Sequence, residues 1–176
     1  MSIKLLKNPT DLHELQDDLE SFCYVVMYLA LRYLPHNRVS VLSAIMASVF
    51  EHHYNVPTGV QGGNGKNSMV HSRGYIGKDL DFTDNEPLTS WIELALRFVA
   101  DWYAYLNQSI KYMSPEIPRL ELSNRPLRNH NALEQNFQTA PEKTWASNDK
   151  AVDHPPPKGK KNLQQTQAGR SERRVG

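Results

Sequence analysis

One stretch combines glycines with a lysine, as nucleotide-binding loops do when they cradle phosphate groups: Gly62-Gly63-Asn64-Gly65-Lys66. The P-loop pattern also requires a glycine five residues before the glycine that precedes the lysine, and a serine or threonine after the lysine. This chain has Val60 and Asn67 at those two positions. We therefore interpret the stretch as a flexible glycine-rich loop and not as a phosphate site.

Two adjacent histidines and a single cysteine are the remaining candidates for metal binding or nucleophilic chemistry. Glu51-His52-His53 is not the His-Glu-x-x-His pattern, and neighbouring helical residues point about 100° apart, so the two rings do not easily share a metal. We interpret them as solvated histidines at a helix end. Cys23 alone excludes an internal disulfide and a zinc site of clustered cysteines, and its apolar neighbours predict a small core residue.

The acidic string Asp17-Asp18-Leu19-Glu20-Ser21 precedes ten consecutive apolar residues, Phe22 to Leu31. That run lacks the polar stripe of a surface helix and is far shorter than the roughly 20 residues that cross a bilayer. Its Val, Tyr and Phe content also suits a buried strand. Asp17 as N-cap with Glu20 three residues later favours a helix, and Pro35 stops it. We predict a central helix, about residues 18–33, that is buried all round.

These residues carry a resemblance to a known family. The stretch from His13 to Val25, with its Asp17-Asp18-Leu19-Glu20-Ser21 string, resembles the start of the central C-lobe helix in fungal-type protein kinases. The same string resembles that helix in casein-kinase-1-like enzymes. Three further stretches are similar to motifs of the fungal-type family, in the same order along the chain: Gly62 to Lys66, Phe82 to Leu88 and Trp145 to Ala151.

The resemblance implies the C-terminal half of a kinase-like C-lobe over residues 13–153. In the family, the aspartate that corresponds to Asp18 anchors the backbone of the catalytic loop, so Asp17, Asp18, Glu20 and Ser21 form a structural motif and not a catalytic one. The family usually has an arginine just before the aspartate pair, where this chain has Gln16. The full-length enzymes use Mg-ATP to phosphorylate serine or threonine.

The parts of a kinase that hold ATP and metal are missing from the sequence. A glycine-rich strand loop, a strand lysine, a His-Arg-Asp loop and an Asp-Phe-Gly site all precede the central helix in kinases, and none occurs here. We therefore predict no catalytic, ATP-binding or metal-binding residue and no cofactor for this chain alone. Two hypotheses stay open: an inactive fragment of a kinase, and a non-catalytic helical interaction module or pseudokinase remnant. The expected partner of this chain is either the missing upstream kinase segment or another protein.

The rest of the chain predicts a mainly α-helical domain after a lead-in over residues 1–12. A second helix is predicted from Val39 to about His53, with one apolar face made of Leu42, Ile45, Met46, Val49 and Phe50. A long irregular loop is predicted over residues 57–86, with a brief extended piece at 68–70. A third helix begins at Pro87 and carries one continuous apolar face from Leu88 to Leu106. A weaker helix covers about residues 127–137. The aromatic residues of the third helix suit either a ligand platform or, as we interpret them, packing against the central helix: Trp91, Trp102 and Tyr103.

Charge is unevenly distributed although the formal net charge is only +1. Residues 154–176 contain six Lys or Arg and one Glu, a net of +5, which leaves −4 for residues 1–153. The tail is predicted to be disordered. Three interpretations of its positive charge stay open: a nuclear-targeting or nucleic-acid-binding arm, a contact for acidic partners, or a solvated end without function. Without a signal peptide or transmembrane segment, the expected location is intracellular, cytoplasmic or nuclear, with no membrane contact.

Overall fold

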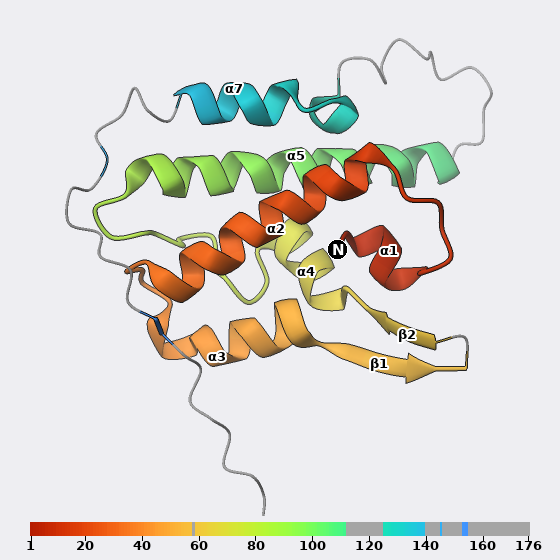
Figure 1. Cartoon of the computed structure of the whole chain (residues 1–176), viewed down its shortest axis with the longest axis horizontal. Coiled ribbons are helices and arrows are strands. Elements are labelled where there is room, and N and C mark those ends of the chain that lie inside the picture. Colours follow the sequence, from red (N-terminus) through yellow and green to blue (C-terminus); the bar gives the residue numbers. More distant parts are fainter. Residues whose placement is uncertain (58, 112–124, 140–144, 146–152, 155–176) are drawn as a thin grey trace, which may run out of the picture.

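The computed structural model describes residues 1–57, 59–111, 125–139, 145 and 153–154, with the side chains of 107–111 excluded. These residues form a mainly helical body with one two-stranded sheet, so the predicted fold class is confirmed at that level. The predicted disorder of the tail beyond His154 lies outside the described residues. Figure 1 shows the long helix α5 beneath α7, with α2 running diagonally across the body.

The central helix α2 spans Leu15–Tyr33 and begins three residues before the predicted start. Asp17 is not the N-cap. It is the third helical residue, and its Oδ2 accepts the backbone N–H of Glu14 at 2.9 Å, which makes Glu14 the capping position. The predicted stop is confirmed, because α2 ends two residues before Pro35 and the N–H of Leu34 donates to the carbonyl oxygen of Ala30 at 2.9 Å.

The prediction that α2 is buried all round is wrong. Tyr24 and Met27 are buried, but Phe22, Val25 and Leu29 are 44%, 54% and 47% exposed. These three residues are spaced i, i+3 and i+7, so they lie on one side of the helix, which we call the open face of α2. The rest of α2 packs against α5 and the short helix η3, and two other predicted core residues, Leu19 and Val26, are half-buried.

The second predicted helix is a succession of three short helical segments: η1 (Val39–Val41), α3 (Leu42–Ile45) and a π-helix, η2 (Met46–Glu51). It ends two residues before the predicted boundary. The predicted apolar face is confirmed, because four of its residues are buried and the fifth, Phe50, packs partly buried against them: Leu42, Ile45, Met46 and Val49.

The predicted long loop over residues 57–86 is wrong in its first half. Strands β1 (His53–Val56) and β2 (Gly59–Gly62) pair antiparallel, with His53 opposite Gly62 and Val56 opposite Gly59. Helix α4 (Asn64–Ser72) follows at once, and it includes the residues 68–70 that were predicted to be extended. Only residues 73–85 form an irregular connection.

Helix α5 (Glu86–Lys111) confirms the third predicted helix and most of its apolar face. Trp91 is 3% exposed and Trp102 and Tyr103 are half-buried against the core, which supports packing and not a ligand platform. The weaker helix is divided into η3 (Pro126–Arg128) and α7 (Asn131–Thr139), and both lie along α5.

The predicted lead-in contains a short helix, α1 (Ile3–Lys7), that belongs to the core. Ile3 is 1% exposed and lies in one hydrophobic cluster with residues of α2, α4, α5 and α7. Figure 1 shows α1 beside α4 and near the start of α2. Within the described residues, the structure has no helix that is long and apolar enough to cross a membrane.

Candidate functional site

Four elements bring polar side chains together where α1 meets the start of α2. We call this cluster the polar junction, and it consists of five residues that are far apart in the sequence: Ser2, Asp17, Glu20, Lys66 and Tyr103. The first precedes α1, the next two come from α2, and the last two come from α4 and α5. All except Tyr103 are buried, so the junction lies inside the body and not on its surface.

Glu20 is the central acceptor of the polar junction. Its Oε1 accepts hydrogen bonds from the backbone N–H of Ile3 and the hydroxyl of Tyr24, both at 2.8 Å, and its Oε2 accepts the hydroxyl of Tyr103 at 2.7 Å. Glu20 is therefore not the capping-box partner that its spacing predicted. Desolvation raises the pKa of its carboxyl group, and the hydrogen bonds from Tyr103, Ile3 and Tyr24 oppose that rise.

Lys66 supplies the opposite charge. Its side chain is buried, its Nζ donates to the carbonyl oxygen of Met1 at 2.9 Å, and the ammonium lies 4.6 Å from the centre of the Tyr24 ring. Desolvation lowers the pKa of Lys66, and the charge of Glu20 opposes this effect. The cation–π contact and the carbonyl replace part of the water that the ammonium has lost.

Asp17 fastens α1 to the first turn of α2. Its Oδ1 accepts the hydroxyl of Ser2 at 2.6 Å, and its Oδ2 lies 3.5 Å from the Nζ of Lys4. The same ammonium contacts Glu14 Oε2 at 2.8 Å, and the backbone N–H of Lys4 donates to the hydroxyl of Tyr103 at 3.1 Å. Helix α1 is thus held by directional polar contacts as well as by the burial of Ile3.

The structure separates the four residues of the predicted structural motif. Asp17 and Glu20 belong to the polar junction, whereas Asp18 is exposed and pairs with His13, with 3.0 Å between Oδ1 and Nε2. Without a catalytic loop to hold, Asp18 is expected either to cap its own helix or to have no partner, and the contact with His13 is neither of these. Ser21 donates its hydroxyl to the carbonyl oxygen of Asp17 at 2.6 Å, one turn earlier in α2, and so makes a local contact only.

The glycines before Lys66 allow close packing and do not form a flexible loop, so that interpretation is wrong. A Cβ at Gly65 would overlap the backbone carbonyl oxygen of Ser48 in η2, and one at Gly62 would lie 2.9 Å from the carbonyl oxygen of His52. Gly63 precedes α4 with φ of +84°, a left-handed conformation that favours glycine. Together these positions let α4 approach η2 closely enough to direct Lys66 into the junction.

The structure supports the solvated interpretation of the histidines, because His52 and His53 are both exposed. Across the part of the chain that the structure describes, no group of three or more His, Cys, Asp or Glu residues is arranged to hold a metal ion. Cys23 is 3% exposed, and burial raises the pKa of its thiol to about 12, as expected for an inert core cysteine.

Sequence reasoning missed Ser2, Lys66 and Tyr103 as members of the polar junction. Lys66 carried a signal, because a lysine that follows three glycines within four residues occupies a crowded backbone environment. Tyr103 carried a weaker one, since it lies on the apolar face of α5 and its hydroxyl requires a partner when buried. Ser2 carried none that we recognise.

The polar junction connects α1, α2, α4 and α5 through buried polar contacts. Each carboxylate and ammonium group of the polar junction has a partner inside the chain. Comparison with known proteins adds no assignment, because the chain matches no protein-family model, no curated protein and no solved structure.

Proposed function

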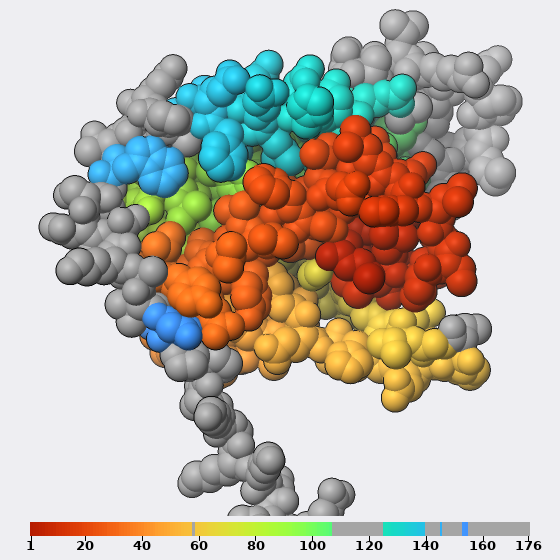
Figure 2. Space-filling model, in the orientation of Figure 1, coloured from red at the N-terminus to blue at the C-terminus, as the bar shows by residue number. Residues whose placement is uncertain are grey.

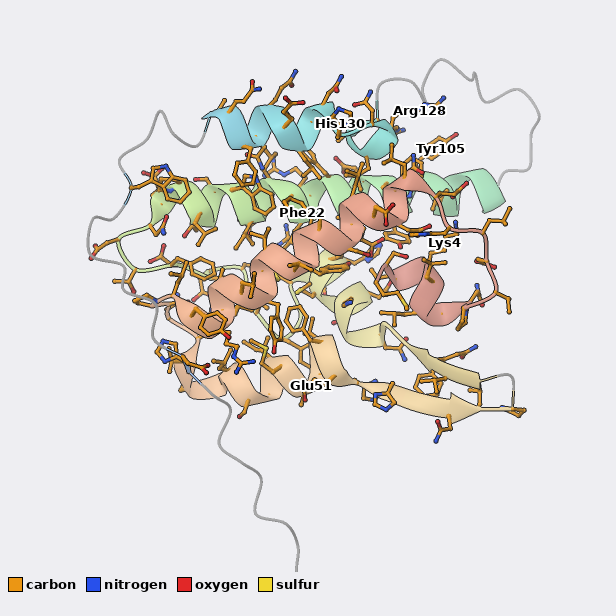
Figure 3. The ribbon with its side chains drawn as sticks, in the orientation of Figure 1. Lys4, Phe22, Glu51, Tyr105, Arg128 and His130 are labelled. Atoms are coloured by element: carbon orange, nitrogen blue, oxygen red, sulfur yellow. The ribbon has the colours of Figure 1, made fainter. Side chains whose placement is uncertain are left out.

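We propose that this chain is the C-terminal part of the C-lobe of a fungal-type protein kinase, an enzyme that transfers phosphate from ATP to serine or threonine. The observation that carries the proposal is the open face of α2. Phe22, Val25 and Leu29 are each about half exposed on the helix around which the core is assembled. Figure 3 labels Phe22 on α2, and Figure 2 shows α2 at the surface next to α7.

An apolar face on a central helix favours a neighbour that covers it. Burying an aliphatic or aromatic side chain completely stabilises a protein by about 1.5–3 kcal/mol. A neighbour that covered these three half-exposed side chains would therefore add a few kcal/mol of stabilisation. Such surfaces commonly mark contacts with another polypeptide. In the proposed kinase, the part of the longer chain that lies upstream of residue 1 supplies this cover.

Asp18 supports the same proposal. It precedes Phe22 by four residues and Val25 by seven, so it lies on the same side of α2 as the open face. Its carboxylate is exposed and contacts His13. In the kinases that this chain resembles, the corresponding aspartate holds the backbone of the catalytic loop, and Asp18 is accessible for that role.

The chain alone is proposed to be inactive. Phosphoryl transfer depends on charges held around the ATP phosphates, chiefly metal ions, a lysine and an aspartate. The buried carboxylates and the buried ammonium group of the polar junction, Asp17, Glu20 and Lys66, are already bonded within the chain. Mg-ATP is therefore a ligand of the longer enzyme and not of this part.

A non-catalytic helical interaction module is the second candidate function. It is favoured by the single hydrophobic cluster that joins α1, α2, α4, α5 and α7, because such a core suits a unit that folds by itself. In that case, the open face of α2 binds a different protein.

Isothermal titration with Mg-ATP, followed by a radiolabel transfer assay, tests the proposal. We expect no micromolar binding and no transfer by the 176-residue chain, and both activities in a chain extended by the coding sequence upstream. An extended chain that contains no kinase-like segment would favour the interaction module. Transfer by the short chain, lost on changing one carboxylate, would contradict both hypotheses.

A further inference from the structure

A hollow of about 620 Å³ lies between α4 and α5, apart from both the polar junction and the open face of α2. Its charged lining comes from the end of α4, the following connection and the middle of α5: Arg73, Lys78, Glu93 and Arg97. Three of these side chains are permanent cations at neutral pH and one is an anion. The lining therefore has an excess of two positive charges.

Arg73 and Glu93 form an ion pair in the lining of this hollow. The guanidinium donates from Nε to Glu93 Oε1 at 3.3 Å and from Nη2 to Oε2 at 3.1 Å, while Nη1 donates to the carbonyl oxygen of Val70 at 2.9 Å. Arg73 adopts φ of +57°, an uncommon left-handed conformation for a residue other than glycine. Glu93 is thus held by Arg73, and its charge is balanced within the pair.

Lys78 and Arg97 are the uncompensated charges. Both are exposed, and neither has an acidic partner in the part of the chain that the structure describes. The neighbouring carboxylate of Asp79 is bonded to Arg38 and does not balance Lys78. Arg97 follows Glu93 by one helical turn of α5, so its guanidinium projects from the same side of the helix.

This positive hollow contrasts with the acidic body around it. Residues 1–153 have a formal net charge of −4, whereas the concave lining of the hollow has an excess of +2. The lining is therefore opposite in sign to the net charge of the body. A concave surface of one charge sign concentrates small ions of the opposite sign. Guanidinium and ammonium groups are the side chains that bind phosphate oxygens best, because their hydrogen bonds to anions are charge-assisted.

We propose that the hollow between α4 and α5 binds a phosphate monoester, with Arg97 and Lys78 as the groups that contact the phosphate oxygens and Arg73 as a positioning residue held by Glu93. The volume accommodates a phosphate group together with a small organic substituent. None of the residues involved belongs to the open face of α2, so this site does not depend on the proposed kinase origin.

The test uses the full 176-residue chain, titrated at constant ionic strength with phenyl phosphate while backbone amide NMR signals are recorded. We expect saturable shifts that are confined to residues of α4, the 73–85 connection and the middle of α5. Arg97→Gln and Lys78→Gln should each weaken binding by about tenfold, the usual effect of losing one charge-assisted hydrogen bond. Each variant keeps a polar, surface-compatible side chain and should fold normally.

Arg128→Gln is the matched control, because Arg128 is also an exposed arginine but belongs to η3, which Figure 3 shows on the side of α5 that faces away from α4. Its affinity should equal that of the unchanged chain. A second titration uses a phosphoserine peptide. If the natural ligand is a phosphorylated polypeptide, this peptide should bind more tightly than phenyl phosphate. If the natural ligand is a small metabolite, the two affinities should be equal. Shifts that do not saturate, or that weaken equally in Arg128→Gln, would overturn the proposal.

Discussion

At the scale of single residues, the polar junction places a carboxylate and an ammonium group inside a small helical body. Each charge loses hydration when it is buried, and the loss is offset only if the geometry supplies hydrogen bonds. Glu20 receives three donors and Lys66 has a carbonyl and an aromatic face. The junction therefore fixes the position of α1 more than it adds net stability.

The ionisation of Glu20 gives a pH-dependent prediction. Because burial raises the pKa of Glu20, the folded state holds that proton more firmly than the unfolded state. The resulting stability is fully present below about pH 4.5, the ordinary value for this group, and is lost as the pH rises through the folded pKa. Glu20→Gln cannot ionise and lacks this dependence.

The measurement for Glu20 is urea unfolding of both proteins between pH 4 and pH 8. The free energy of unfolding of the unchanged chain minus that of Glu20→Gln should fall as the pH rises, while contributions from the other titrating groups largely cancel. A difference that stays constant or increases across this range would show that Glu20 is not buried as described.

Gly65 yields a second prediction at this scale. Gly65→Ala places a Cβ against the Ser48 carbonyl oxygen, so α4 must move away from η2 and Lys66 must shift with it. We expect a loss of about 1–3 kcal/mol in the free energy of unfolding, the usual cost of overpacking. Thermal denaturation measures it, with Asn64→Ala, an exposed position in the same helix, as the control that should change little. Equal stability of the two variants would contradict the close approach.

At the scale of elements, the hydrophobic run of α2 predicts more burial than the structure has. Ten consecutive apolar residues have no polar stripe, yet Tyr24 and Met27 face the core while Val25 and Leu29 face outward. Sequence periodicity reveals which side of a helix is polar, but it cannot show which side of an apolar helix lacks a neighbour. That information depends on where the other elements pack.

The strongly periodic elements were predictable and the glycine-rich ones were not. Helix α5 has an apolar residue every three to four positions and a proline at its start, so both its existence and its buried face followed from the sequence. Helix α4 has little amphipathic pattern and follows glycines that ordinarily indicate a loop. It is stabilised by the buried contacts of Lys66 and Met69, which are tertiary and leave no local signal.

The candidate site was predictable only in part for the same reason. Asp17 and Glu20 were recognised as structural residues of the first turn of α2, but as partners of each other in a helix cap. Their actual partners, Ser2 and Tyr103, are 15 and 83 residues away in the sequence. Contacts over such separations depend on the packing of α1 and α5, which no spacing rule encodes.

Two substitutions in α2 compare its buried and open sides. Met27→Ala leaves a cavity at a position that is 1% exposed and should cost about 2–5 kcal/mol. Val25→Ala, only two residues earlier, should leave the free energy of unfolding within about 0.5 kcal/mol, because surface changes rarely exceed that amount and alanine favours helix. Chemical denaturation of both variants measures the difference. Comparable losses at the two positions would mean that something covers Val25 in the isolated chain.

At the scale of the whole molecule, the described elements enclose one core and yet leave an apolar side of their central helix uncovered. Figure 2 shows α2 on the outer surface between α7 above and the α3 region below. The two proposed functions agree that another polypeptide covers this face and differ in whether it belongs to the same longer chain.

Site-specific labelling distinguishes these possibilities through accessibility at Val25. Cys23 is the single cysteine of the sequence, it is buried, and the pKa of its thiol is raised to about 12, so it should react slowly with a maleimide in the folded protein. Val25→Cys places a second thiol on the open face of α2, where the parent residue is 54% exposed. In the 176-residue chain this thiol should react rapidly, and the unchanged chain gives the background from Cys23.

In a chain extended upstream, the proposed kinase origin requires that the same thiol become protected, because the preceding segment packs on the open face of α2. Val60→Cys on β2 is the control for general accessibility, since Val60 is 52% exposed and lies on the hairpin, and it should react equally in both lengths of chain. We expect the rate at position 25 to fall by at least about tenfold, the effect of a stable cover that opens less than one tenth of the time. Full reactivity at position 25 in the extended chain would contradict the kinase proposal and leave the interaction module as the remaining hypothesis. In that case, addition of the separate partner protein should protect the thiol at position 25.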